Sequence, residues 1–133
     1  MPSLNFTMFI PAVENGLAEL EGRPLPHPGV RPKRQTIRAL RKVPIKPGDV
    51  LHLFTGMRTK GCHRLGKAKC KSRKAVLIQD RHGTTDVRLS GSPLGLDKAQ
   101  AFARSDGFAS LLDLRRWFER VHGLPFRGVV IRW

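Results

Sequence analysis

The most prominent chemically active residues in this sequence are lysines and arginines concentrated in the middle of the chain. Between positions 31 and 74 the chain carries fifteen lysines and arginines against a single carboxylate, Asp49. Cations at this density neutralise phosphates, and arginine, which outnumbers lysine over the whole chain, presents a forked donor that matches a phosphate group. Because the stretch contains no amphipathic basic helix, we favour nucleic acid as the partner over an anionic lipid surface or a merely solvated basic face.

The best candidates for phosphate contacts lie on and just after a basic loop predicted at residues 56–61. Several donors on one loop can follow a phosphate backbone without reading its sequence. Two arginines further upstream offer the same chemistry. A solvated loop without a ligand is the alternative. We therefore predict six nucleic-acid-binding residues, namely Arg34, Arg38, Arg58, Lys60, His63 and Arg64.

The two cysteines, Cys62 and Cys70, are too few for a disulfide framework. With His63 and His82 nearby they share the residue types of a zinc site, but the sequence contains neither a CxxC nor an HxxxH pair. We therefore predict no metal and no cofactor. Cys70 alternates with Ala68 in a strand-like run and is expected to be a buried apolar thiol, whereas Cys62 is expected to be a reduced loop thiol.

Length and composition predict one domain over residues 1–133, with a proline-rich loop at residues 23–32. The apolar fraction of 40% is that of a folded chain. No apolar run approaches the roughly 20 residues of a membrane span, and the N-terminal residues lack the features of a secretory signal. We expect a cytoplasmic monomer without a membrane partner.

Hydrophobic periodicity predicts a β-rich middle with helices towards both ends. The alternation of Leu4, Phe6 and Met8 predicts a strand, and a helix follows to residue 20. Further strands are predicted at 35–38, 50–54, 65–70, 75–79, 86–89 and 129–133, and further helices at about 98–103 and 109–122. This order predicts the α+β class, with five to six strands in a small mixed β-barrel or a strongly bent sheet, flanked by helices.

Two details of this pattern concern local packing. Pro47-Gly48 predicts a type II turn in front of the strand at residues 50–54, with Asp49 as a turn residue. In the last helix, one apolar stripe is expected to face the core, formed by Leu111, Leu114, Phe118 and Val121.

Groups of residues along essentially the whole chain resemble the ASCH domain family, in the form typical of small phage and prophage members. They are Lys33-Arg34-Gln35-Thr36-Ile37-Arg38, residues 46–51 and 55–60, Ser105-Asp106-Gly107-Phe108, Trp117-Phe118, residues 125–128 and Trp133. The resemblance implies a PUA-like β-barrel whose cleft faces RNA or a nucleotide, so RNA is expected before DNA.

Some bacterial ASCH proteins are amidohydrolases that remove the acetyl group from N4-acetylcytidine with a lysine, a threonine and a distant glutamate. The resemblance implies Lys33 as the base, Thr36 as the nucleophile, and Asp106, in place of the glutamate, as the acid that orients Lys33 or protonates the leaving amine. A threonine hydroxyl needs such a base, and nearby cations favour neutral lysine. We expect Lys33 and Asp106 on opposite walls of one cleft, with Thr36 between them.

Each of these residues also has a purely structural explanation. Thr36 is an ordinary strand residue, Lys33 and Arg38 are equally suited to contact phosphates, and Asp106 stands where the last helix needs an N-cap. Phe54, Trp117 and Trp133 are expected to pack in the core, and His122 to interact with a helix dipole.

The functional alternatives to an amidohydrolase therefore stay open. They are a non-catalytic RNA- or DNA-binding module, a ribonuclease, and a phage accessory protein that binds a host nucleoprotein.

Overall fold

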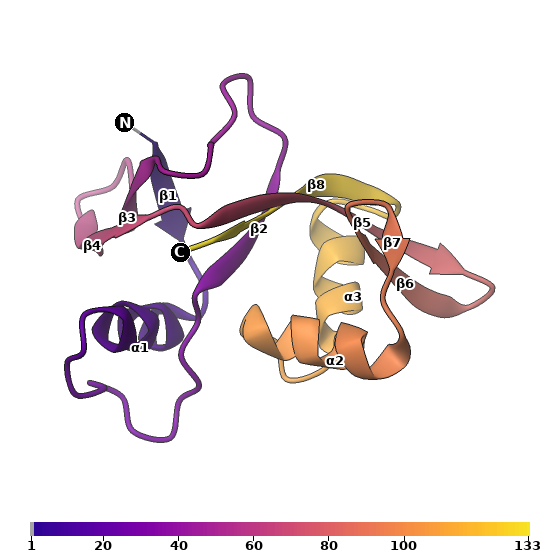
Figure 1. The fold of residues 1–133 in the computed structure, drawn as a ribbon, viewed down its shortest axis with the longest axis horizontal. Helices are drawn as coiled ribbons and strands as arrows, with labels where there is room; N and C mark the ends of the chain where they lie inside the picture. Colours follow the sequence, from indigo (N-terminus) through magenta and orange to yellow (C-terminus); the bar gives the residue numbers. More distant parts are fainter. Residues whose placement is uncertain (1) are drawn as a thin grey trace.

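The computed structural model describes residues 2–133, which form eight strands and three helices (Figure 1). The strands are β1 (Ser3–Phe6), β2 (Gln35–Ala39), β3 (Val50–Thr55), β4 (His63–Lys69), β5 (Ser72–Arg81), β6 (Thr84–Leu89), β7 (Ser92–Pro93) and β8 (Phe126–Arg132). The helices are α1 (Ile10–Leu20), α2 (Leu96–Ser105) and α3 (Leu111–Val121). The predicted α+β class is confirmed, and every element predicted from periodicity is present with ends shifted by a few residues.

The strands form two sheets that share one side of the molecule. The small sheet has the order β1-β3-β4, with β1 parallel to β3, and the large sheet has the order β2-β8-β5-β6-β7. In the large sheet, β8 lies between β2 and β5 and is antiparallel to both. Figure 1 shows α1 beneath the small sheet, and α2 and α3 beneath the large one.

The hydrogen bonds do not close these strands into the barrel that we expected. In residues 2–133, β1 and β2 are edge strands of different sheets and are not paired with each other. Side chains occupy the gap between them instead: the Arg38 guanidinium lies over the Phe6 ring, 4.8 Å from its centroid. We call this opening between β1 and β2 the seam.

Two hydrophobic cores meet at the central strand β8. One core lies between the large sheet and α2 and α3, and includes Val130 and Phe118. The other lies between the small sheet and α1, and includes Ile131 and Trp133. Because neighbouring residues of a strand point to opposite faces, the apolar run at the end of β8 serves both cores and ties the two sheets together.

Helix α1 positions the start of residues 33–38, which we call the Lys33 motif. The backbone N–H of Lys33 donates to the Ala12 carbonyl at 2.8 Å, and a Cβ on Gly16 would lie 2.0 Å from the Lys33 carbonyl oxygen. Only glycine therefore permits this approach. The buried Asn15 amide donates to the carbonyls of His27 and Val30, each at 2.8 Å, which anchors the proline-rich loop on the helix.

Local details of the sequence analysis are confirmed in one case and corrected in two. Asp49 N–H donates to the Lys46 carbonyl across the Pro47-Gly48 turn, as expected. The N-cap of α3 is Ser110, whose hydroxyl accepts from Asp113 N–H, so Asp106 does not cap this helix. Val121, predicted to be buried, is 50% exposed because it is the last residue of α3 and lies beyond Phe118, the last buried residue of the helix.

No helix in the part of the chain that the structure describes is long and apolar enough to cross a membrane.

Candidate functional site

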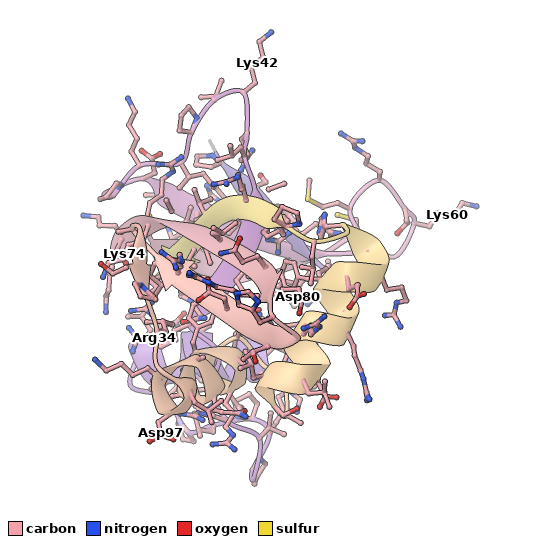
Figure 2. All side chains as sticks on the ribbon, turned by 90° about the vertical axis from the view of Figure 1, so that its right-hand side faces the viewer. Arg34, Lys42, Lys60, Lys74, Asp80 and Asp97 are labelled. Carbon is pink, nitrogen blue, oxygen red and sulfur yellow. The ribbon has the colours of Figure 1, made fainter. Side chains whose placement is uncertain are left out.

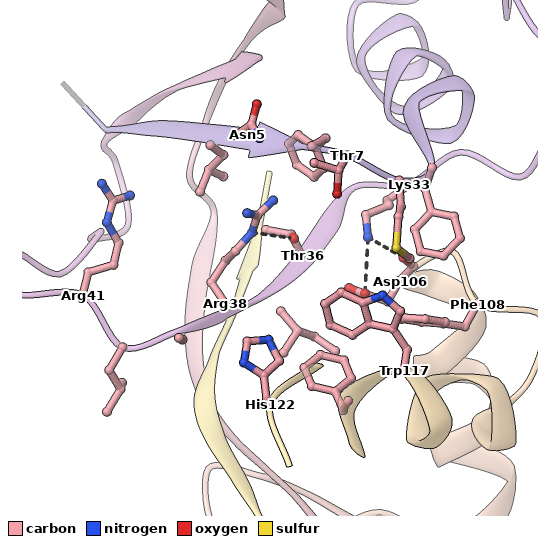
Figure 3. Close-up of a pocket in the computed structure, with 18 of the residues that line it drawn as sticks. Asn5, Thr7, Lys33, Thr36, Arg38, Arg41, Asp106, Phe108, Trp117 and His122 are labelled. Atoms are coloured by element: carbon pink, nitrogen blue, oxygen red, sulfur yellow. Dashed lines mark hydrogen bonds and ion pairs between the residues drawn. The ribbon is translucent and has the colours of Figure 1, made fainter. Parts of the chain in front are cut away.

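The seam contains a pocket of about 460 Å³. Its walls come from β1 and the segment after it, from β2, and from the α2–α3 region, so residues more than a hundred positions apart meet there (Figure 3). Lys33, Thr36, Arg38 and Asp106 all line it. This volume is in the range of pockets that hold small organic ligands.

Lys33 and Asp106 form an ion pair on the inner wall of the pocket. Lys33 Nζ lies 3.3 Å from Asp106 Oδ2 and also donates a hydrogen bond to the main-chain oxygen of Asp106. The two residues are 3% and 4% exposed. The expectation that they share one cleft is confirmed, but they touch each other, so Thr36 lies beside the pair and not between its members (Figure 3).

The surrounding backbone and one amide hold Asp106 in place. Asp106 is the C-cap of α2, and its N–H donates to the carbonyls of Phe102 and Ala103. Gln35 Nε2 donates to Asp106 Oδ1 at 3.4 Å. The next residue, Gly107, has φ +105°, and a Cβ there would lie 2.7 Å from the Phe9 ring. The chain can therefore turn away from Asp106 only because residue 107 is glycine.

Burial moves the Lys33–Asp106 pair towards its uncharged form. Desolvation lowers the pKa of Lys33 from the ordinary lysine value, although the Asp106 carboxylate opposes this change. Desolvation likewise raises the pKa of Asp106, although Lys33 opposes it. Both shifts favour moving the shared proton from the amine to the carboxyl group, and the neutral amine is a base.

Thr36 and Arg38 project from the same face of β2 and form a second pair. Arg38 Nε donates to Thr36 Oγ1 at 3.0 Å. Thr36 is 4% exposed, and Arg38 is held over the Phe6 ring. Because the threonine oxygen accepts this bond, its own proton is left to donate elsewhere. Burial lowers the pKa of Arg38, but the usual value of arginine is so high that the guanidinium stays charged near neutrality.

An aromatic wall faces the two pairs. Phe108, Trp117, Phe118 and His122 line this side of the pocket. The rings of Trp117 and Phe118 are 4.8 Å apart with an interplanar angle of 73°, and His122 stacks on Phe118 at 5.6 Å. A planar heterocycle that enters the pocket would therefore meet aromatic surface on one side and polar groups on the other.

The structure separates most of the predicted nucleic-acid-binding residues from this pocket. Arg38 lines it, whereas Arg34 donates to the Trp133 main-chain oxygen and pairs with Glu19 in a different groove. Arg58 and Lys60 are exposed on the loop after β3, and Figure 2 shows Lys60 at the tip of that loop.

The remaining two predicted residues, His63 and Arg64, are exposed at the start of β4 and not on the loop. Arg64 is within hydrogen-bonding distance of His52 Nδ1, at 3.0 Å. The loop touches the pocket wall indirectly, because Met57 N–H donates to the side chain of Asn5, which lines the pocket. Lys33 is too buried to contact a phosphate on the surface.

Several pocket residues were not predicted as functional from the sequence. Trp117 packs against the core as predicted and also lines the pocket. His122, which was expected to interact with a helix dipole, lines the pocket as well. Arg41, which lines the pocket, was also missed, as was Gln35, which does not line the pocket but donates to Asp106. The position of Gln35 inside the Lys33 motif was the one sequence signal that could have indicated it. Phe54 was predicted to pack in the core, but it is half-buried and belongs to neither core, because the register of β3 shifts directly before it; Trp133 packs in the core as predicted.

Neither cysteine belongs to the pocket: Cys62 is exposed and Cys70 is buried, as expected. Within residues 2–133, no cluster of three or more His, Cys, Asp or Glu side chains is arranged to hold a metal ion.

Comparison of the chain with protein-family models, with curated proteins and with solved structures finds no match.

Proposed function

We propose that this protein binds a cytidine whose N4 carries an acyl group and hydrolyses that amide. The observation that carries the proposal is the buried Lys33–Asp106 pair next to the Thr36 hydroxyl on the wall of an aromatic-lined pocket. The resemblance of the Lys33 motif to ASCH amidohydrolases supports the same reaction. Two sheets that open around the pocket are compatible with a PUA-like ancestry of the fold.

The proposed nucleophile is Thr36 and the proposed base is Lys33. A hydrogen bond from Arg38 to Thr36 Oγ1 favours negative charge as it develops on that oxygen, and it leaves the threonine proton for the Lys33 amine. Lys33 acts as a base in its neutral form, which burial promotes. Asp106 positions the amine and accepts its excess proton between steps.

In the first step, Thr36 Oγ1 attacks the acyl carbon while its proton passes to Lys33. The carbonyl electrons move to oxygen, and the resulting oxyanion is stabilised by the Arg38 guanidinium. The C–N4 bond then breaks, the Lys33 ammonium returns the proton to the departing nitrogen, and cytidine leaves. The acyl group remains on Thr36 as an ester.

In the second step, water attacks the Thr36 ester with Lys33 as its base. The ester bond breaks, the proton returns to Thr36 Oγ1, and the carboxylic acid is released. The sum is the amide plus water giving cytidine and the acid, so no cofactor is required.

Binding of RNA without hydrolysis is the second candidate function, because the chain has a formal net charge of +15. In that case the pocket would hold a base between the aromatic wall and Arg38, and the loop at residues 56–61 would contact the backbone.

Incubation with N4-acetylcytidine and longer N4-acyl cytidines, followed by chromatography for cytidine, tests the proposal. Wild type is expected to release cytidine, and Thr36→Ala is expected to release none above the uncatalysed rate. Asp106→Glu restores the acid of the resembling family and tests whether the shorter carboxylate limits the rate. If neither wild type nor Asp106→Glu releases cytidine from any of these substrates while wild type binds RNA, the binding module replaces the hydrolase.

A further inference from the structure

The molecule has a second, strongly cationic groove on the other side of β2. Its volume is about 550 Å³, and its cationic walls are formed by Arg31, Arg34, Lys71 and Arg132. Thr36 and Arg38 line the seam pocket, whereas Gln35, which points to the opposite face of the strand, lines this groove. We call it the rear groove.

The sheet register explains why these cations converge. Gln35 pairs with Arg132 on one side of β8, and Ser72 pairs with Arg132 on the other side. Lys71 precedes Ser72 directly, and its N–H donates to the Arg132 carbonyl at 2.7 Å. Cations separated by as many as a hundred positions in the sequence thus come from adjacent ends of β2, β8 and β5. In the view of Figure 2, Arg34 and a further basic residue, Lys74, both lie on the left-hand side of the molecule.

Most of this positive charge is not neutralised inside the protein. Glu19 is the one acidic side chain that lines the rear groove in the described chain, and it pairs with Arg34 at 3.3 Å. Arg34 also donates to the main-chain oxygen of Trp133, so its guanidinium is fixed by internal partners. In residues 2–133, Arg31, Lys71 and Arg132 make no ion pair with a carboxylate. They remain available to an external anion.

We propose that the rear groove binds the phosphodiester backbone of a single-stranded nucleic acid. Two arginines and a lysine supply charge, and the neighbouring hydroxyl-bearing residues Ser72 and Ser105 add neutral hydrogen-bonding groups, the mixture that typically contacts backbone phosphates. A concave site suits a strand better than a flat bilayer. The groove also lacks an exposed large apolar side chain to insert into lipid, since Trp133 is 1% exposed.

This site is separate from the seam pocket and does not depend on hydrolysis. Arg38 and Asp106 face the pocket, and Gln35, which lines the groove, donates a hydrogen bond to Asp106. The test therefore uses a ligand that has no acylated base. Failure of the hydrolase would leave the groove intact, and failure of the groove would leave the hydrolase intact.

The test is the fluorescence anisotropy of labelled single-stranded oligouridine with the full chain, over a series of salt concentrations. The triple variant Arg31→Ala, Lys71→Ala, Arg132→Ala is expected to bind about tenfold more weakly or worse at low salt. Its log–log salt slope should be smaller by about 2, because each lost phosphate contact on a single strand removes about 0.7. The double variant Arg31→Ala, Lys71→Ala changes only residues outside the strands and should lower the slope by about 1.4 even if Arg132→Ala disturbs folding.

The matched control is Arg81→Ala, Arg116→Ala, Arg120→Ala, which removes the same charge from exposed residues that do not line the groove. It is expected to lose less than about threefold in affinity. Oligothymidine in a parallel titration shows whether RNA or DNA is preferred. The proposal would be overturned by equal losses of affinity in the control and groove variants, or by the absence of oligouridine binding at low salt. Tighter binding to phosphatidylserine vesicles or to polyglutamate than to oligouridine would also overturn it.

Discussion

The seam pocket and the exposed loop at residues 56–61 use similar cations in opposite ways. In the pocket, Lys33 is 3% exposed and is held by Asp106, and Arg38 is held by Thr36 and the Phe6 ring. On the loop, Arg58 and Lys60 are exposed, and in residues 2–133 neither makes an ion pair. Burial changes the proton affinity of a cation and suits it to catalysis, whereas exposure preserves its charge and suits it to long-range attraction.

The largest expected effect would come from removing the reacting groups of the pocket. Thr36→Ala and Lys33→Ala should each lower the turnover of an N4-acyl cytidine by at least about 1,000-fold, down to the uncatalysed rate. The double variant should be no worse than either single one, because the two residues act as a unit. Initial rates of cytidine release measure this.

The loop supplies the control for that comparison. Arg58→Ala with Lys60→Ala should leave the turnover of the free nucleoside within about twofold of wild type, because neither residue lines the pocket. Equal losses of turnover in the loop variant and in Thr36→Ala would contradict the assignment of catalysis to the pocket and of long-range attraction to the loop.

The second effect concerns the stability of the buried pair. Asp106→Ala leaves the Lys33 amine buried without its carboxylate and should lower the free energy of unfolding by about 3–5 kcal/mol. Lys33→Met combined with Asp106→Leu should recover most of that loss, because apolar side chains need no partner there. Urea unfolding measures both. Asp113→Ala, at an exposed residue of α3, serves as the control.

If the double replacement were as unstable as Asp106→Ala, the pair would be needed for folding, and its presence in the pocket would say little about catalysis. Recovery of stability with complete loss of turnover is the result that fits a functional pair.

A smaller effect is expected from the loop in nucleic-acid binding. Replacing Arg58, Lys60 and Arg64 with alanine removes three exposed cations and should lower the log–log salt slope for single-stranded RNA by at most about 2. Thr36→Ala removes no charge and should leave this affinity nearly unchanged. Anisotropy titrations between about 50 and 200 mM salt measure the slope, and an unchanged slope in the triple variant would remove the loop from the binding surface.

The smallest effect is a displacement of the pH profile. Lys33 must be neutral to act as a base, so kcat/KM should rise with pH through a Lys33 pKa that burial has lowered. The Asp106 carboxylate opposes this lowering, so Asp106→Asn should move the rising limb to lower pH in the activity that remains. A limb that moves to higher pH would exclude Lys33 as the titrating base. Asp113→Asn is the matched control.

The sequence predicts the individual strands and helices of this fold better than it predicts whether the strands close into a barrel. Alternation and helical spacing are local properties, and they indicated β3, β5 and α3 correctly apart from their ends. The division into two sheets depends on which strand edges meet, and β1 and β2 are kept apart by side chains such as Arg38 and Phe6. A periodic pattern contains no such information, so a closed barrel was predicted.

The candidate site could likewise be predicted from the sequence only in part. The proximity of Lys33 and Asp106, 73 positions apart, was predicted from a family resemblance and not from their spacing. A tryptophan or a histidine looks the same in a sequence whether it packs in a core or lines a pocket. The place of Trp117 and His122 on the pocket wall could therefore be found only from the structure. The structure was also needed to show that Lys33 contacts Asp106 directly and that Thr36 instead accepts a hydrogen bond from Arg38.

The most direct test of the account is the mass of the intact protein during turnover of N4-acetylcytidine. Acid-quenched wild type should carry one acetyl group, mapped by peptide analysis to Thr36, while cytidine accumulates in the supernatant. Thr36→Ala should carry none and release no cytidine. Cytidine release by Thr36→Ala at the wild-type rate, or acetylation of wild type at a residue outside the pocket, would contradict the account.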